Sequence, residues 1–122
     1  MIAATNGFES VTVTDLETMG TAELDALPFG VVGLRPDTTA DVYNATESHL
    51  SGVSPESVIG VPFFANIGQC MNNFMVAQRF EDEDDLDDIV PYVLTLRMRP
   101  TRVRLRLLAR GDTQRRYILI ER

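Results

Sequence analysis

The chain carries its only cysteine, Cys70, and its only histidine, His49, within the stretch DVYNATESHLSGVSPESVIGVPFFANIGQCMNN. A cysteine thiolate becomes a nucleophile when a neighbouring base activates it, and His49 could serve as that base. No motif for an oxyanion hole or for a group that orients the histidine accompanies them, so a thiol enzyme is the weakest interpretation. A zinc site would need more clustered ligands. Taken alone, Cys70 is interpreted as an inert buried thiol, because free cysteine behaves as a small hydrophobic residue in most cores.

Two other side chains in this stretch, Tyr43 and Glu47, could also carry chemistry, but each has a structural interpretation. Glu47 lies three residues after Asn44 and could close a capping box at a helix start. Tyr43 could be an aromatic residue at the end of a strand, with its hydroxyl group hydrogen-bonded. The residue types alone favour these structural roles. The segment FGVVGLR has neither the GxGxxG spacing nor the lysine of a phosphate loop, so nucleotide hydrolysis is not indicated.

The elements that position these residues fit one domain. The chain has 122 residues, of which 44% are hydrophobic and 24% charged, as in an ordinary globular protein. Thr14 and Glu17 have capping-box spacing and predict a short helix that ends near Gly20. A second short helix is expected over residues 21–27. The N-terminal part is therefore predicted to be helical.

The middle of the chain predicts a hairpin followed by helices. Residues 29–35 have the pattern of a buried strand, and residues 40–43 have that of its hairpin partner across the PDTT turn. Asn44 and Ser54 are expected to begin short helices, the second with proline at its first position. Apolar residues between positions 73 and 88 predict one longer helix.

After the acidic run EDEDDLDD the apolar period changes to two and predicts three antiparallel strands up to residue 120. Arginines at 97, 99, 102, 104 and 106 then line one sheet face, which is either solvated and neutralised by the acidic run or a surface for a protein partner. These elements make an α+β domain, with an antiparallel sheet of about five strands, short helices mainly on one side and one longer helix.

Charge and composition exclude several partner classes. The net charge of −7 argues against nucleic acid, which would need a basic face. No apolar stretch approaches the ~18 residues of a membrane span. One cysteine cannot form an internal disulfide, and no secretory signal is seen near Met1, so a cytoplasmic location is expected.

The chain contains, in this order, the motifs LPFGVVGL, VYNATE and VIGVPFF, then Cys70 and the motif MRPTRVR. This order resembles the photoactive yellow protein family, whose members are PAS-type light sensors, and the resemblance runs from Phe8 to Arg122. A generic PAS domain would not be expected to combine Tyr43, Glu47 and Cys70 at these spacings. The resemblance implies a single PAS-like photosensory domain, with an N-terminal helical cap over residues 1–27 and a core over residues 28–122.

The resemblance also implies a chromophore, p-coumaric acid (4-hydroxycinnamic acid), attached to Cys70 as a thioester. Its phenolate would accept hydrogen bonds from Tyr43 and from protonated Glu47, since charge-assisted bonds stabilise a buried anion and burial keeps a carboxyl group neutral. Three further pocket residues are implied: Ser51 supporting Tyr43, Phe63 in the pocket wall, and Met98 on the sheet side.

In a sensor of this kind, blue light isomerises the chromophore and Glu47 gives up its proton. The buried carboxylate left behind destabilises local packing, and the N-terminal cap is expected to loosen. No catalytic turnover is implied. The partner would be a downstream signalling protein, which the sequence does not name, and the chain is expected to be a monomer or weak dimer.

The sequence departs from the family pattern at several positions. Val53 stands where the family has a pocket-covering arginine, and four more departures are Gln69, Met71, Leu94 and Tyr117. The absorption maximum and the recovery rate of this chain are therefore not predicted from those of the family. The alternative from another functional class is a PAS-like interaction module without a chromophore, in which Cys70 is inert and the arginine face binds a protein.

Overall fold

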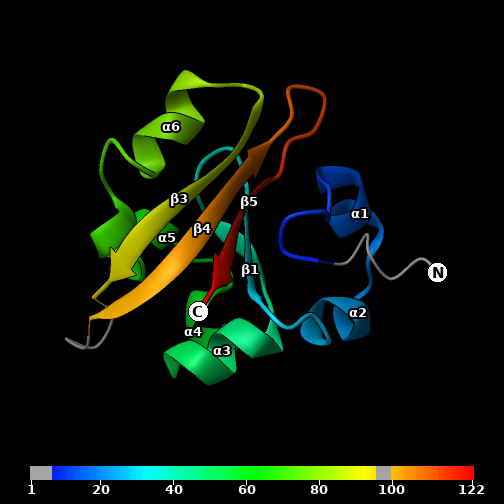
Figure 1. The fold of residues 1–122 in the computed structure, drawn as a ribbon, viewed down its shortest axis with the longest axis vertical. Helices are drawn as coiled ribbons and strands as arrows, with labels where there is room; N and C mark the ends of the chain where they lie inside the picture. Colours follow the sequence, from blue (N-terminus) through cyan, green and yellow to red (C-terminus); the bar gives the residue numbers. More distant parts are fainter. Residues whose placement is uncertain (1–6, 96–99) are drawn as a thin grey trace.

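The computed structural model describes residues 7–95 and 100–122, which fold around one antiparallel sheet (Figure 1). The sheet has five strands in the order β2-β1-β5-β4-β3. The strands are β1 (Gly30–Leu34), β2 (Ala40–Tyr43), β3 (Leu86–Leu94), β4 (Thr101–Ala109) and β5 (Arg116–Glu121). The predicted class, an α+β domain with an antiparallel sheet of about five strands, is confirmed.

The register of the sheet explains how distant segments meet. β1 forms a hairpin with β2 and also pairs with β5, in which Val32 lies opposite Ile118. β3 pairs with β4 along its whole length and leaves its other side as a sheet edge. Pro91 lies in this edge strand, where its missing N–H removes no bond from the centre of the sheet.

The helices among the described residues are all short. Those before the sheet are α1 (Val13–Thr18) and α2 (Thr21–Asp25). Those between β2 and β3 are α3 (Ala45–Ser51), α4 (Pro55–Val58), α5 (Phe63–Asn66), the 3₁₀ turn η2 (Gln69–Met71) and α6 (Ala77–Asp82).

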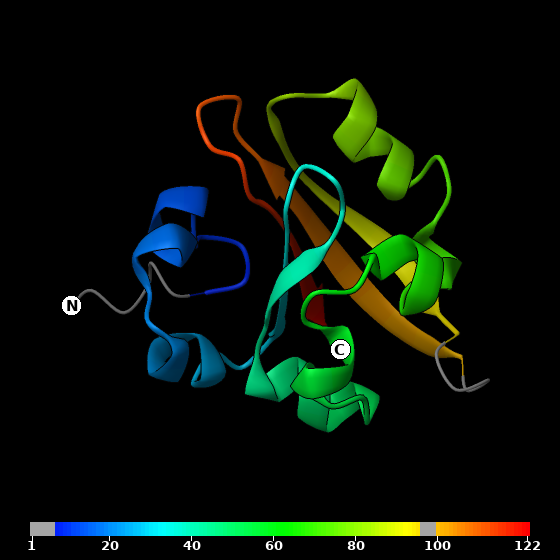
Figure 2. The same cartoon turned by 180° about the vertical axis from the view of Figure 1, so that it is seen from behind.

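The two faces of the sheet bury separate hydrophobic clusters. In β5, Tyr117 and Leu119 pack with the N-terminal segment, whereas Ile118 and Ile120 pack with residues of α4 to α6. The alternation follows from the period of two in a strand. Figures 1 and 2 show the corresponding layers, with the blue N-terminal segment on one side of the sheet and the green helices on the other.

The first helix begins two residues earlier than its sequence pattern predicts. Thr12, not Thr14, is the N-cap, and it exchanges hydrogen bonds of 2.9 and 3.1 Å with Asp15. The prediction chose Thr14 and Glu17 because both pairs have the same spacing. Glu17 is instead used in a contact with the sheet. The N-cap of α2 is Gly20.

The longer helix predicted over residues 73–88 is wrong. Only α6 is helical there, and β3 already begins at Leu86. Phe74 and Met75 are exposed, so their apolar character did not mark a buried helix face. The Asn73 side chain instead accepts hydrogen bonds from the amides of Met75 and Val76, which fixes a turn before the helix.

Of the predicted arginine face, Arg97 and Arg99 lie outside the described residues, and the part in β4 is largely covered by the N-terminal segment. Arg106 is 5% exposed and donates to the carbonyls of Phe8 (2.9 Å) and Val11 (2.6 Å). Its other nitrogens bind both carboxylate oxygens of Asp87 in β3. Arg104 bonds Glu9 at 2.8 Å. Neutralisation of the arginines by the acidic run, as predicted, therefore holds for Asp87. The same face also binds the N-terminal segment.

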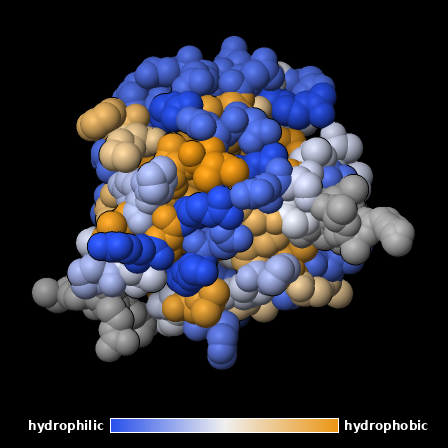
Figure 3. All heavy atoms as spheres, in the orientation of Figure 1, coloured by the Kyte–Doolittle hydropathy of each residue, from blue (hydrophilic) through white to orange (hydrophobic). Residues whose placement is uncertain are grey.

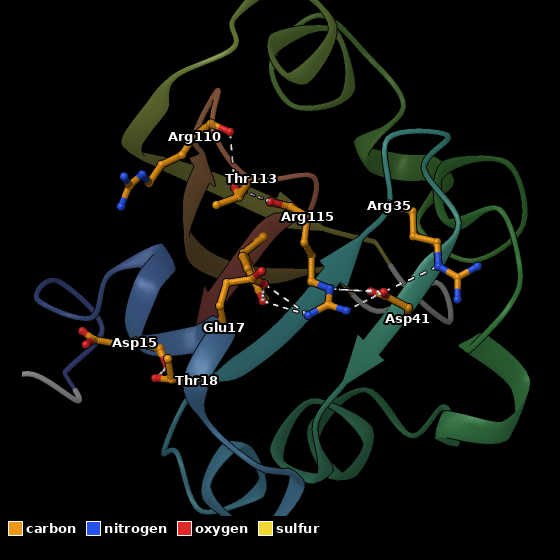
Figure 4. A network of polar contacts seen from close by, with 9 residues as sticks. Asp15, Glu17, Thr18, Arg35, Asp41, Arg110, Thr113 and Arg115 are labelled. Carbon is orange, nitrogen blue, oxygen red and sulfur yellow. Dashed lines mark hydrogen bonds and ion pairs between the residues drawn. The ribbon is translucent and has the colours of Figure 1, made fainter.

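A second polar contact joins α1 to the sheet. The Tyr117 hydroxyl of β5 donates a short hydrogen bond to Glu17, and Arg115 bonds the same carboxylate at 3.2 Å. Arg115 also binds Asp41 of β2 through two nitrogens, and Arg35 lies 3.6 Å from that carboxylate (Figure 4). Tyr117 is fully buried, so its hydroxyl group needs this partner.

The surface is mixed in polarity. Hydrophilic side chains crowd the end of the molecule where α6 and the β4–β5 turn lie (Figure 3). Within residues 7–95 and 100–122, none of the helices has the length and apolar character that crossing a bilayer requires.

Candidate functional site

The site is built around α3, whose start is fixed by Asn44. Its side-chain oxygen accepts from the amides of Glu47 (3.1 Å) and Val31 (2.9 Å), and its side-chain nitrogen donates to the carbonyls of Leu24 and Phe29. One buried amide thus satisfies the helix N-terminus and ties it to β1 and α2. Because Asn44 caps the helix through the Glu47 amide, the Glu47 side chain is left available for another partner.

The Glu47 carboxyl group points into the protein and is 1% exposed. It lies over Gly30 of β1, where a Cβ atom would overlap Oε1 and come within 3.0 Å of the Glu47 Cβ. A glycine is needed here because any larger residue would push α3 away from the sheet. The capping-box role considered for Glu47 is therefore only half correct, since its amide is capped and its carboxylate is not part of the cap.

Arg122, directly after β5, holds the Glu47 carboxylate. Its two terminal nitrogens lie 2.7 Å from Oε1 and 3.2 Å from Oε2. Burial raises the pKa of Glu47 above its ordinary value, and the Arg122 guanidinium opposes that rise. The sequence analysis missed this pair, because 75 positions separate the two residues and only the sheet register brings them together.

Tyr43 and Ser51 form the neighbouring polar pair. The Tyr43 hydroxyl lies 2.7 Å from the Ser51 hydroxyl, which also accepts from the Val53 amide. Burial raises the pKa of Tyr43 to about 12, although the Ser51 bond and the Arg122 charge act in the opposite direction. A tyrosine with this pKa stays protonated at neutral pH and can donate a hydrogen bond.

Cys70 lies in η2 and is partly buried. It packs against the same hydrophobic cluster that contains Tyr43 and Phe63, the latter 3% exposed. Gly68 permits this packing, because a Cβ there would lie 2.6 Å from the Phe63 ring. The structure therefore places four predicted residues, Tyr43, Ser51, Phe63 and Cys70, on one side of the sheet, together with buried Glu47.

Two residues that the sequence analysis missed hold the backbone at Cys70. The Tyr92 hydroxyl of β3 donates to the Cys70 carbonyl at 2.5 Å, and the Asn73 side chain donates to the same carbonyl at 3.2 Å and to the Tyr92 hydroxyl at 2.6 Å. The alternation of apolar residues in β3 predicts that Tyr92 faces the core, but it does not predict that its hydroxyl group bonds to Cys70. These bonds fix the position of the thiol-bearing turn against the sheet.

Met98 and His49 are the remaining candidates. Met98 is outside the described residues. His49 is exposed and lines an open surface depression with Asp25 and Pro28. No group of three or more potential metal ligands is found in the described part of the chain. Val53, which stands where the family has a pocket-covering arginine, packs against the hydrophobic cluster that contains Tyr43 and Phe63.

The arrangement combines a free thiol with buried hydroxyl and carboxyl groups. A thiol can accept an acyl group to form a thioester. The Tyr43 hydroxyl group can donate a hydrogen bond to an anionic oxygen beside the apolar cluster, and Glu47 could do the same in its protonated form.

Comparison with known proteins identifies the family. The chain is 37% identical over 92 residues to a photoactive yellow protein of Rhodothalassium salexigens, which covers 73% of this chain and 74% of the relative. It is 30% identical over 95 residues to a photoactive yellow protein of Halochromatium salexigens, covering 75% and 76% of the two chains. The chain belongs to the photoactive yellow protein family. No model of a protein family matches it.

The structural comparison agrees with this assignment. The photoactive yellow protein domain of the sensor histidine kinase Ppr from Rhodospirillum centenum superposes with a TM-score of 0.82 at 37% identity, covering 89% of this chain and 98% of that domain. A PAS domain of an HTR-like protein from Haloarcula marismortui has a TM-score of 0.63 at 17% identity, covering 90% and 98%, and shows the shared fold alone. This chain is thus a photoactive yellow protein-type PAS sensor domain and not an enzyme, and its family implies a chromophore.

Proposed function

We propose that this domain is a blue-light receptor that carries p-coumaric acid as a thioester on Cys70. The observation that carries the proposal is the shared cluster: a free, partly buried thiol borders the same apolar region as the hydrogen-bonded Tyr43–Ser51 pair. Membership in the photoactive yellow protein family supports it. Met98 is proposed as a further pocket residue from the resemblance alone.

Each residue has a separate role in this proposal. The Cys70 sulfur would bond to the carbonyl carbon of an activated acyl donor, and the activating group would leave with the thiol proton. Tyr43 and protonated Glu47 would donate hydrogen bonds to the phenolate oxygen, while Ser51 orients Tyr43. When bound, the p-coumaroyl group would supply a double bond that absorbs blue light and isomerises.

Glu47 would then give its proton to the displaced oxygen and become a buried carboxylate. Such a charge destabilises its surroundings unless it finds a partner. α3 is linked to the N-terminal segment, because the Asn44 side chain donates to Leu24 and the Ala45 amide donates to Asp25 at 2.7 Å. A disturbance at α3 could therefore reach residues 1–27, the proposed cap, and loosen them for a downstream partner in the cytoplasm.

The interaction module without a chromophore is less well supported. Its binding surface would be the arginine face, yet Arg104 and Arg106 are already bonded to Glu9, Glu121, Asp87 and the carbonyls of the N-terminal segment. Among the arginines of β4, Arg102 is the one that remains exposed and could contact a partner.

Reconstitution with activated p-coumaric acid tests the proposal. The parent protein is expected to gain the mass of one p-coumaroyl group that survives denaturation, together with an absorption band that bleaches in blue light and recovers in the dark. Cys70→Ala and Cys70→Ser should fold, as judged by far-ultraviolet circular dichroism, but retain no adduct, because only the thiol forms the thioester. An adduct that persists in Cys70→Ala would remove the attachment site.

A further inference from the structure

The ion pair between Arg122 and Glu47 joins two elements that the family resemblance did not connect. Arg122 follows β5, and the C-terminal end of the described chain lies beside α3 in both ribbon views (Figures 1 and 2). The Glu47 side chain is 2% exposed and that of Arg122 is 17% exposed. The carboxylate is therefore enclosed, whereas the guanidinium lies between the interior and solvent.

The geometry of the pair favours an ionised carboxyl group. Both terminal nitrogens of Arg122 donate, one to each oxygen of Glu47, and a guanidinium has no lone pair with which to accept a proton from a neutral acid. Within the described residues, the titratable groups that face Glu47 are Tyr43 from β2 and Arg122 itself, while β1 presents only the backbone of Gly30. Arg122 is therefore the positive charge available to balance this carboxylate.

The proposed function needs Glu47 in both protonation states. As a neutral acid it would donate to the phenolate, and after light-driven proton transfer it would be ionised. A charge-assisted, two-point bond weakens when the carboxyl group becomes neutral. Arg122, partly exposed at the end of a strand, could then turn toward solvent without burying an unpaired charge.

We infer that Arg122 is an exchangeable counter-ion that binds Glu47 whenever its carboxyl group is ionised, before the chromophore is attached and again after proton donation. The part of this inference that concerns the state after proton donation rests on the proposed function, whereas the part that concerns the chromophore-free protein does not. Arg122 is thus a positioning residue, which stabilises the ionised state of Glu47 and couples that state to the end of β5.

The first test uses the chromophore-free protein. Infrared spectroscopy across a pH series would follow the carbonyl band of protonated Glu47, assigned by its loss in Glu47→Gln. In Arg122→Gln this band is expected to persist to higher pH than in the parent, since the carboxylate has lost its counter-ion. Arg122→Lys should restore most of the parent behaviour because it keeps the charge. Arg116→Gln is the matched control, as Arg116 lies in β5, which Arg122 directly follows, and donates to the Phe80 carbonyl.

An identical pH profile in the parent and Arg122→Gln would overturn the inference, and so would a Lys variant that behaves like Gln. If Arg122→Gln does not fold, the parent protein still gives an answer. The nuclear magnetic resonance signal of the Arg122 guanidinium should shift over the same pH range in which Glu47 becomes protonated. A guanidinium signal that does not shift over this pH range would contradict the pairing of Arg122 with Glu47.

The second test uses reconstituted protein. The bleached state of Arg122→Gln should decay about tenfold faster than that of the parent, which corresponds to about 1.4 kcal/mol less stabilisation of the ionised Glu47. An equal or slower decay would overturn the light-state half of the inference. A protein that takes up no chromophore would instead reject the proposed function, and the titration of the chromophore-free protein would still stand.

Discussion

Glu47 is a fully enclosed carboxyl group whose role depends on whether it holds a proton. Replacing it with glutamine keeps its size and one donor group but removes the transferable proton. A neutral amide donates a weaker hydrogen bond than a carboxylic acid, so more negative charge would stay on the conjugated system and the absorption band of the reconstituted Glu47→Gln protein should move to the red. Light should also cause a smaller loss of helical signal, because no buried carboxylate forms.

The same substitution at an exposed glutamate provides the control. Glu56→Gln in α4 makes the same chemical change on the surface of the protein, and it should leave the spectrum unchanged. Parent-like colour and parent-like light response in Glu47→Gln would move Glu47 out of the site.

Residue-level prediction from the sequence succeeded where partners are close in the chain and failed where they are distant. The Tyr43–Ser51 hydrogen bond spans two neighbouring elements and was anticipated from the family pattern. Arg122 was not anticipated, since its contact with Glu47 depends on β5 pairing with β1 and on α3 crossing Gly30. The roles of these residues toward a chromophore stay predictions.

Among the elements, β4 offers a sharp test of how the N-terminal segment is held. Arg106→Gln would leave the Phe8 and Val11 carbonyls without their buried donor and Asp87 without its bidentate partner. We expect the free energy of unfolding to fall by about 2–4 kcal/mol, measured by urea denaturation. Amide exchange in residues 7–18 should rise more than exchange in the sheet.

Arg102→Gln is the matched control, because Arg102 has the same orientation in the same strand but is exposed. Its effect should stay within about 0.5 kcal/mol. Equal losses in the two variants would show that the contacts of Arg106 with the N-terminal segment contribute nothing specific.

Element boundaries were predicted least well where a local pattern had two solutions. Thr12–Asp15 and Thr14–Glu17 both have capping-box spacing, and tertiary contact decides between them because Glu17 is needed by Tyr117. The false longer helix arose because Phe74 and Met75 are apolar yet exposed. The strands were predicted better, since alternation directly reports which face is buried.

For the whole molecule, alkaline pH should reveal the burial of Tyr43. The folded protein retains the Tyr43 proton up to a pKa of about 12, whereas the unfolded chain releases it near the ordinary value of 10.0. The contribution of Tyr43 to stability is therefore complete below pH 10 and is lost as the pH rises to 12, by about 2–3 kcal/mol. Urea unfolding of Tyr43→Phe should show a correspondingly smaller decline over this window. Parallel declines in both proteins would contradict the assignment.

Light should change the N-terminal segment more than the sheet. Under continuous blue light, hydrogen exchange in reconstituted protein is expected to increase first before residue 27, because the helices described there, α1 and α2, are only six and five residues long. Protein kept in the dark is the control. Unchanged protection before residue 27 in protein shown to be bleached would reject cap loosening as the signal.

The alternating contacts of β5 constrain its length more than its composition. Tyr117 faces the N-terminal segment, while Ile118 and Ile120 face the site, and Arg122 reaches Glu47 just beyond the strand. Inserting or deleting one residue between Tyr117 and Arg122 would change the side that the following residues face, so Tyr117 could not contact Glu17 while Arg122 contacts Glu47. An insertion of two residues would preserve the alternation but would carry Arg122 about 6.6 Å further along the strand, away from Glu47. Variation in this strand should therefore be tolerated as substitutions but not as changes in length.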